Sequence, residues 1–332
     1  MSEKFQPVES GWLNSAERIE HGVWRPGIFD QYGEMAAGAS TKQLEQRSTD
    51  EEVAISAGQK KPAARMRIMA DARRTIGDRD ELATALKVPT NSSEVDAFRD
   101  KKVVAGLILT RLMRELDPES DPRNIIKTGL EHGATVVTVD AEYLKKSKAE
   151  LASVKADGLI TNLEHVPLMV AAADCAPVII YDPVKKAIGV FHSGWKGTLQ
   201  QISRRGIEAM SAAYGTQPQD LRVAVGPHAD GDHYEVGADV YTKFMESVEA
   251  DGSRTYSEED LSMIFKSHPT APGKYFFDSG NAIAITLRKS GIPNEQIEIT
   301  HYSTMIDNDK FSSERVEGTK DRDNTIVMAI LK

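Results

Sequence analysis

Short runs of β-branched and other apolar residues dominate the chain after residue 134, and they constrain the fold more than any other feature. Bounded by turn residues, they predict strands over 135–139, 159–161, 168–171, 178–181, 187–191, 221–225, 296–300 and 324–331. Amphipathic spacing predicts helices between them, over 198–214, 238–250 and 279–290. Because strands and helices come in mixed order rather than in strict alternation, we expect an α/β fold with a mixed sheet.

The rest of the chain gives weaker signals. Residues 1–60 and 251–274 carry neither pattern, and we expect irregular chain there. Start and stop residues predict helices over 62–77 and 78–86. A longer helix over 94–116 carries an apolar stripe, which predicts packing onto the chain's own core; a subunit interface or a lid over the site is the alternative.

Composition limits the partners. With 332 residues the chain can bury a full core without disulfides or a structural metal. Acidic residues outnumber basic ones by 50 to 41, and we find no basic cluster, so we expect no nucleic-acid partner. The most apolar stretch, 166–181, is shorter than a bilayer span and contains Asp174, which predicts no membrane-spanning helix and no membrane partner.

Cysteine usage bears on the compartment. Cys175 is the single cysteine, so an intramolecular disulfide cannot form. Residues 1–9 are charged and have no apolar run, which argues against a secretory signal. Together these features predict a reducing cytoplasm.

One thiol and two imidazoles lie at the ends of predicted strands or in the turns beside them. His132 precedes the strand at 135–139, Cys175 precedes the strand at 178–181, and His192 follows the strand at 187–191. These residues can supply three ligands to a zinc ion and leave the fourth position for water or substrate. The alternative is a small buried cysteine and two structural histidines.

The turn that follows His192 predicts a second kind of site. Its sequence is Ser193-Gly194-Trp195-Lys196-Gly197-Thr198, at a strand-to-helix transition. Backbone N–H groups and the Lys196 ammonium would favour an anion there. An ordinary tight turn with a capped helix is the alternative, and Trp195 fits either a core anchor or a base-stacking platform.

Several motifs together resemble one family. The chain has Ala173-Asp174-Cys175-x-Pro177, followed seventeen residues after the cysteine by His192-x-Gly194-Trp195-Lys196-Gly197. Further matches are Glu131-His132-Gly133, Gly226-Pro227 with Tyr234-Glu235-Val236-Gly237, and Phe311-x-Ser313-x-Arg315 with Glu317-Gly318. They resemble the YfiH-like family, whose members were named multicopper polyphenol oxidoreductases or laccase-domain proteins. The family is now understood as zinc-dependent purine nucleoside phosphorylases with adenosine deaminase side activity.

The resemblance implies a fold and an organisation. It implies a single α/β sandwich similar to the catalytic domain of cytotoxic necrotising factors. We expect one domain over 1–332, with a divergent N-terminal part (1–90) and a helical insertion at about 91–123. A homodimer is compatible with this organisation.

The resemblance also implies residue roles. His132, Cys175 and His192 would hold one zinc ion per chain, and the substrates would be a purine nucleoside and phosphate. Lys196 and Arg315, with the turn residues Ser193 and Gly194, would bind phosphate or substrate. Asp174, next to the cysteine, is the candidate catalytic residue, either as acid/base or by orienting its neighbours; a simple turn carboxylate is the alternative.

Two positions and one short segment depart from the family pattern. Lys196 replaces an arginine, which removes a bidentate phosphate contact. Val316 replaces the second arginine of the C-terminal motif, and residues 229–233 replace the usual Cys-Cys run after Gly-Pro. These changes bear on substrate and activity more than on fold or metal.

Two rival functions follow from the same residues. A copper-dependent polyphenol oxidase needs a histidine-rich trinuclear cluster, but the chain has only eight histidines and none are spaced His-x-His. A non-catalytic metal- or nucleoside-binding protein that kept the fold is the other alternative. We expect phosphorolysis of adenosine or inosine, with adenosine deamination as a second reaction.

Overall fold

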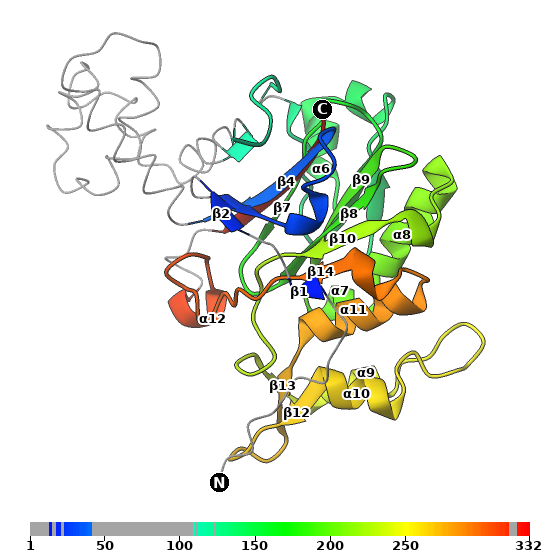
Figure 1. Ribbon diagram of the computed structural model, residues 1–332. Coiled ribbons are helices and arrows are strands. Elements are labelled where there is room, and N and C mark those ends of the chain that lie inside the picture. Colours follow the sequence, from blue (N-terminus) through cyan, green and yellow to red (C-terminus); the bar gives the residue numbers. More distant parts are fainter. Residues whose placement is uncertain are drawn as a thin grey trace, which may run out of the picture.

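The computed structural model describes residues 13–14, 18–20, 23–41, 109, 112–113, 115–121, 124–318 and 324–332. Two sheets lie face to face, and helices cover the outer face of the larger one (Figure 1). The helices predicted over 62–77 and 78–86, and most of the one predicted over 94–116, lie outside the described residues.

The larger sheet contains seven strands within the described residues, in the order β1-β14-β10-β8-β9-β6-β5. Their bounds are β1 (Leu13–Asn14), β5 (Val136–Thr138), β6 (Gly158–Thr161), β8 (Ala176–Asp182), β9 (Ala187–Ser193), β10 (Arg222–Val225) and β14 (Ile297–Ile299). The antiparallel hairpin β8–β9 lies in the middle, whereas β5 runs parallel to β6 and β14 runs parallel to β10. The sheet is therefore mixed, as predicted.

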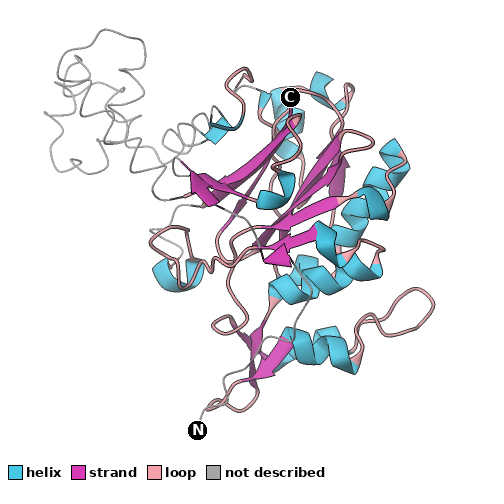
Figure 2. Ribbon diagram, viewed as in Figure 1, coloured by secondary structure: helices cyan, strands magenta, loops and turns pink. Residues whose placement is uncertain are grey.

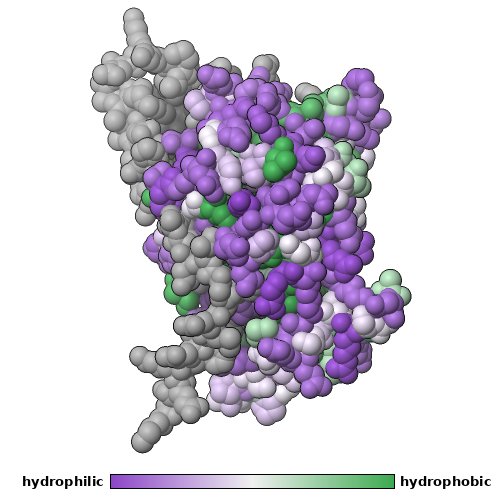
Figure 3. All heavy atoms as spheres, turned by 45° about the vertical axis from the view of Figure 1, so that its right-hand side comes forward, coloured by the Kyte–Doolittle hydropathy of each residue, from purple (hydrophilic) through white to green (hydrophobic). Residues whose placement is uncertain are grey.

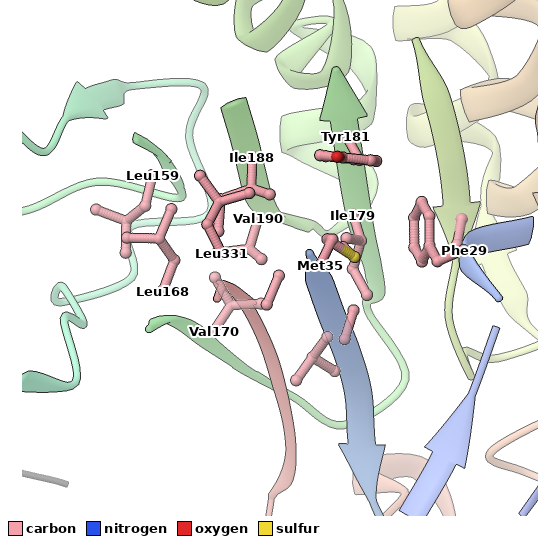
Figure 4. Packing of buried hydrophobic residues seen from close by; sticks show 14 of the residues in the cluster. Phe29, Met35, Leu159, Leu168, Val170, Ile179, Tyr181, Ile188, Val190 and Leu331 are labelled. Carbon is pink, nitrogen blue, oxygen red and sulfur yellow. The ribbon is translucent and has the colours of Figure 1, made fainter. Parts of the chain in front are cut away.

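A second sheet, fully antiparallel over its described strands, packs on this one (Figure 2). Its order is β2-β3-β4-β15-β7, with bounds β2 (Arg18–Glu20), β3 (Val23–Arg25), β4 (Met35–Ser40), β7 (Leu168–Ala172) and β15 (Thr325–Leu331). Buried apolar side chains fill the space between the sheets: Ile179 and Val190 from the first lie near Val170 and Leu331 from the second (Figure 4). This shared core confirms the predicted mixed-sheet α/β sandwich.

The expectation of irregular chain over 1–60 is wrong, because β1, β2, β3 and β4 all lie there. The longest of them, β4, lies in the middle of the second sheet. Its sequence, Met-Ala-Ala-Gly-Ala-Ser, is made mostly of small residues that seldom favour strands. All six are buried, so packing between neighbouring strands, rather than local preference, makes this segment a strand.

Helices cover the outer face of the larger sheet. They are α7 (Trp195–Leu199), α8 (Ile202–Tyr214) and α11 (Ser279–Lys289). Ile207 and Met210 of α8 pack with Phe191 of β9 and with Ile283 of α11. The single helix predicted over 198–214 is interrupted at Gln201, whose backbone is left-handed (φ 57°).

The outer face of the second sheet receives part of the predicted insertion. Residues 109, 112–113 and 115–116 are helical, and Leu112, Met113 and Leu116 are buried against Met328 and Ile330 of β15. For this described part, the apolar stripe packs onto the chain's own core.

A third, smaller sheet projects below the sandwich in Figures 1 and 2. It has the order β11-β13-β12, with bounds β11 (Glu235–Gly237), β12 (Phe265–Ser267) and β13 (Lys274–Phe277), and it packs with α9 (Ala238–Met245) and α10 (Glu258–Ile264). Phe244, Phe265 and Phe277 form its aromatic core. The expectation of irregular chain over 251–274 is therefore wrong, because Ser257 and Asp260 form a capping box that starts α10.

Short elements complete the described chain: α6 (Lys148–Ser153), α12 (Glu314–Glu317), and the 3-10 turns η1 (Gly27–Phe29), η3 (Tyr143–Lys145), η4 (Pro218–Asp220) and η5 (Asn294–Gln296). None of the described helices has the length and apolar character needed to cross a bilayer. The face shown in Figure 3 is mainly hydrophilic, with scattered apolar residues.

Gly206 of α8 offers a test of the helix-to-sheet packing. A Cβ at this position would lie 2.4 Å from the buried ring of Phe191. Glycine to alanine in a helix normally stabilises by about 0.5–1 kcal/mol, but overpacking a core costs about 1–3 kcal/mol. We expect Gly206→Ala to lower the free energy of unfolding, measured by urea denaturation.

The control is Ser211→Ala on the exposed side of the same helix, which should change the free energy of unfolding by less than about 0.5 kcal/mol. If Gly206→Ala unfolds at the same urea concentration as the unchanged protein, the close approach of α8 to Phe191 is wrong.

Candidate metal centre

The strand pairing brings the three predicted ligands to one edge of the larger sheet. Cys175 directly precedes β8, and the register pairs Pro177 with His192 near the end of β9. The start of β6 pairs with Phe191, and the start of β5 lies parallel to it. The loop before β5, which carries His132, therefore reaches the same edge as Cys175 and His192.

The three side chains converge. One ligand atom from each of His132, Cys175 and His192 lies within 4.8 Å of the other two. The two imidazole rings meet edge to face, with centroids 5.0 Å apart. A tetrahedral zinc site needs ligand atoms roughly 3.3–3.6 Å apart, so small side-chain movements suffice, and the donor set fits a metal ion.

Asp157 holds two of the candidate ligands in place through hydrogen bonds. Its buried carboxylate accepts backbone N–H groups of Glu131, His132 and Gly133 at 3.1, 3.0 and 2.9 Å. The same carboxylate lies 2.9 Å from Nδ1 of His192. It thereby holds the loop of one ligand and the ring of another, and leaves Nε2 of His192 for the metal.

The electrostatics favour a thiolate beside protonated imidazoles, so metal binding must displace protons from the histidines. Burial raises the pKa of Cys175, but hydrogen bonds and charge from His132 and His192 outweigh it and lower the pKa to about 7. Burial lowers the pKa of His192, yet Asp157 and Cys175 outweigh it and raise the pKa to about 9. The thiolate is thus stabilised next to imidazoles, and a bound metal ion would take the place of their protons.

The absence of a side chain at Gly194 makes room for two of the candidate ligands. A Cβ on this residue would lie 2.9 Å from Sγ of Cys175 and 3.3 Å from Cδ2 of His132. The turn that the sequence singled out as an anion site therefore also packs directly on two of the ligands.

Asp174 is held by protein groups on both carboxylate oxygens. Oδ1 accepts the hydroxyl of Thr304 at 2.7 Å, and Oδ2 accepts the backbone N–H of Arg315 at 2.8 Å. Its carbonyl accepts the N–H of Ala229 at 3.0 Å. The residue is buried and left-handed (φ 75°), and its hydrogen bonds join two loops and the start of α12 directly beside Cys175.

The predicted anion-binding residues differ in exposure and in the groups that they contact. The Ser193 hydroxyl is buried and lies 2.9 Å from that of Thr198, so it faces the protein. Lys196 is exposed, with Nζ 5.6 Å from the ring centroid of Trp195. The guanidinium of Arg315 lies 4.9 Å from the ring centroid of Tyr234.

Sequence reasoning missed Asp157, Thr304 and any role for Tyr234. Asp157 directly precedes β6, and a carboxylate at the start of a strand beside a metal-binding histidine is a recurring pattern. That position was the available signal for Asp157, whereas Thr304 and Tyr234 lie in loops that only the tertiary fold brings to the site.

Comparison with known proteins assigns the chain to a protein family. The family described as multi-copper polyphenol oxidoreductase laccase matches residues 100–329. The chain belongs to this family, which confirms the resemblance seen in its motifs.

Individual relatives carry a different functional name. The chain is 33% identical over 238 residues to the purine nucleoside phosphorylase YlmD of Bacillus subtilis, a match that covers 71% of this chain and 77% of the relative. It is 29% identical over 217 residues to the purine nucleoside phosphorylase slr1573 of Synechocystis, covering 64% and 81% of the two chains.

Solved structures share the fold. YlmD from Geobacillus stearothermophilus has a TM-score of 0.66 at 19% identity, and the match covers 96% of this chain and 99% of that one. The Bacillus licheniformis hypothetical protein YfiH has a TM-score of 0.63 at 20% identity, with 95% and 99% coverage.

Asp157 offers a direct test of the organisation of the centre. Asp157→Asn keeps the shape of the side chain but removes the charge that fixes the His132 loop and His192. We expect about 10–100-fold weaker zinc binding, measured by competition with a chromogenic chelator.

The matched control is Asp182→Asn, at the opposite end of β8. Asp182 is also buried and accepts backbone N–H groups, those of Val184 and Lys185. Its replacement should destabilise the fold but leave zinc affinity unchanged. Equal losses of zinc affinity in both variants would contradict a specific role for Asp157.

Gly194→Ala tests the space beside the ligands. The added methyl group must displace Sγ of Cys175 or the ring of His132, so we expect at least about tenfold weaker zinc binding. We also expect a weaker thiolate band in the absorption spectrum of the cobalt-substituted protein. Gly33→Ala, where a Cβ would meet nothing within 4 Å, is the control; a normal cobalt spectrum in Gly194→Ala would exclude the close contact.

Proposed function

We propose that the protein is a zinc-dependent purine nucleoside phosphorylase that cleaves adenosine or inosine with phosphate and also deaminates adenosine. The observation that carries the proposal is the convergence of His132, Cys175 and His192 at one edge of the sheet. The functional name of the relatives supports the reaction class. A cytoplasmic location remains a prediction from the single cysteine.

Zinc is the metal that we propose, with one ion per chain. A thiolate and two imidazoles are typical zinc ligands, and three of them leave one position open. When bound, the ion would supply Lewis-acid chemistry at that open position. Asp157 would keep the His192 ring oriented toward it.

Phosphorolysis needs residues of the chain that hold phosphate beside the nucleoside. A phosphate oxygen forms a bond to C1′ of the ribose while the bond from C1′ to N9 breaks, and the electron pair leaves with the base, which takes up a proton. Arg315 and Lys196 are the cations proposed to hold phosphate. The turn at Ser193 and Gly194 would contribute backbone groups, because Thr198 holds the Ser193 hydroxyl.

Asp174 is proposed to act on the reaction by positioning. Its two carboxylate oxygens are already bonded to Thr304 and Arg315. A carboxylate held in this way orients neighbouring groups more readily than it exchanges a proton with substrate.

A copper oxidase is a weaker candidate than a phosphorylase. Among the described residues, one group of histidine, cysteine and acidic side chains is close enough to hold a metal, and it comprises three residues. A multicopper oxidase needs a separate histidine-rich cluster of three coppers. The described residues therefore do not supply the copper ligands that the family name implies.

The first experiment combines metal content with turnover. Purified protein is analysed for zinc and copper, then incubated with adenosine and phosphate, and the products are separated by chromatography. We expect about one zinc per chain, with adenine released in the presence of phosphate and inosine formed more slowly. Cys175→Ser should lose both zinc and products, because a neutral hydroxyl is a poor zinc ligand.

Thermal unfolding of Cys175→Ser shows whether the variant still folds. Zinc without any turnover would contradict the phosphorylase and favour the non-catalytic binding protein. Bound copper with oxygen consumption on phenols would favour the oxidase instead.

A further inference from the structure

Tyr234 lies close enough to Cys175 for the charge of the thiolate to act on its hydroxyl. Its side chain is buried, with 8% exposed, and comes from the loop before β11. Burial, and then the negative charges of Cys175 and Asp174, raise the pKa of its hydroxyl to about 12, against a lowering by Arg315. The phenol is therefore a neutral hydrogen-bond donor at physiological pH.

The Arg315 guanidinium is held against the face of this ring. Its Cζ lies 4.9 Å from the ring centroid, which is within cation–π distance. Arg315 also lowers the pKa of Tyr234 through its charge and a hydrogen bond, so the guanidinium lies beside the phenol hydroxyl as well as over the ring. The pair therefore presents a charged fork and a hydroxyl side by side.

No carboxylate of the described residues neutralises Arg315 by an ion pair. The nearby carboxylate, Glu235, is paired with Lys274 and lies 3.5 Å from Nε2 of His268. A guanidinium that is ordered by an aromatic ring, with no ion pair to a carboxylate in the described part of the chain, is suited to a bound anion.

Asp174 fixes this arrangement relative to the metal ligands. It accepts the backbone N–H of Arg315 and directly precedes Cys175 in the chain. Any shift of Asp174 would therefore move the arginine relative to the metal centre.

We propose that Tyr234 and Arg315 form the subsite for the phosphate co-substrate, and that Asp174 is the positioning residue that holds Arg315 at the metal centre. This inference rests on the proposed phosphorylase function. It adds the hydroxyl of Tyr234 to the groups that bind phosphate. It also explains why Asp174 is needed, because Asp174 positions Arg315.

The test uses the zinc-loaded full chain and inorganic phosphate as the probe. Binding is measured by calorimetry, and the KM values for phosphate and adenosine are measured separately. We expect Tyr234→Phe to weaken phosphate binding and raise the phosphate KM by about tenfold, the effect of losing one hydrogen bond to a charged group. The adenosine KM, the zinc content and the melting temperature should stay close to those of the unchanged protein.

Tyr241→Phe is the matched control, since Tyr241 belongs to the same aromatic cluster but stacks on Tyr275. It should leave the phosphate KM unchanged. Arg315→Lys keeps the charge but loses the fork, and should weaken phosphate binding at least as much as Tyr234→Phe.

Asp174→Asn separates positioning from proton transfer. If Asp174 only holds Arg315, the phosphate KM rises, and kcat at saturating phosphate and its pH profile stay near normal. A lost limb in the pH profile of kcat would overturn the positioning role.

The outcomes also separate this inference from the proposed function. If the unchanged protein cleaves adenosine with phosphate but Tyr234→Phe keeps its phosphate KM, or raises the adenosine KM instead, the subsite is overturned and the phosphorylase stands. If the unchanged protein neither binds phosphate nor cleaves adenosine, both are overturned.

Discussion

The hydrogen bonds of the Asp157 carboxylate hold the candidate metal centre together. One buried group gathers three consecutive backbone N–H groups of the loop that carries His132 and also fixes the ring of His192. A buried carboxylate is stable only when its oxygens are satisfied in this way. The loop of His132 and the strand of His192 therefore adopt their geometry together, and Cys175, directly before the neighbouring strand β8, completes the donor set.

The centre of the fold could be predicted from sequence because its strands are made of β-branched residues at regular spacing. The three candidate ligands could be singled out because they lie at strand ends and in recognisable motifs, and the structure brings their side chains together. β4 could not, because small residues carry no strand preference and become a strand only between β3 and β15. The aromatic unit around Phe244 and Phe265 was missed because its strands are short and separated by polar loops.

The supporting residues of the site were harder to predict than the ligands. Asp157 lies before a strand and Tyr234 in a family motif, but the role of each depends on partners that are far away in sequence. The sequence did place Asp174 beside the cysteine, but only the fold reveals that Thr304 and Arg315 occupy its oxygens. Roles that depend on a partner's position need the tertiary structure.

The three candidate ligands can meet only if β8 and β9 pair in the native register. Pro177 pairs with His192, so Cys175 and His192 reach the same edge only in this alignment of β8 and β9. A slip of one residue would turn every side chain of β9 to the opposite face and would carry His192 away from both partners. Metal bound by all three ligands therefore marks a correctly assembled sheet, so metal supply during folding would select the native pairing over its shifted neighbours.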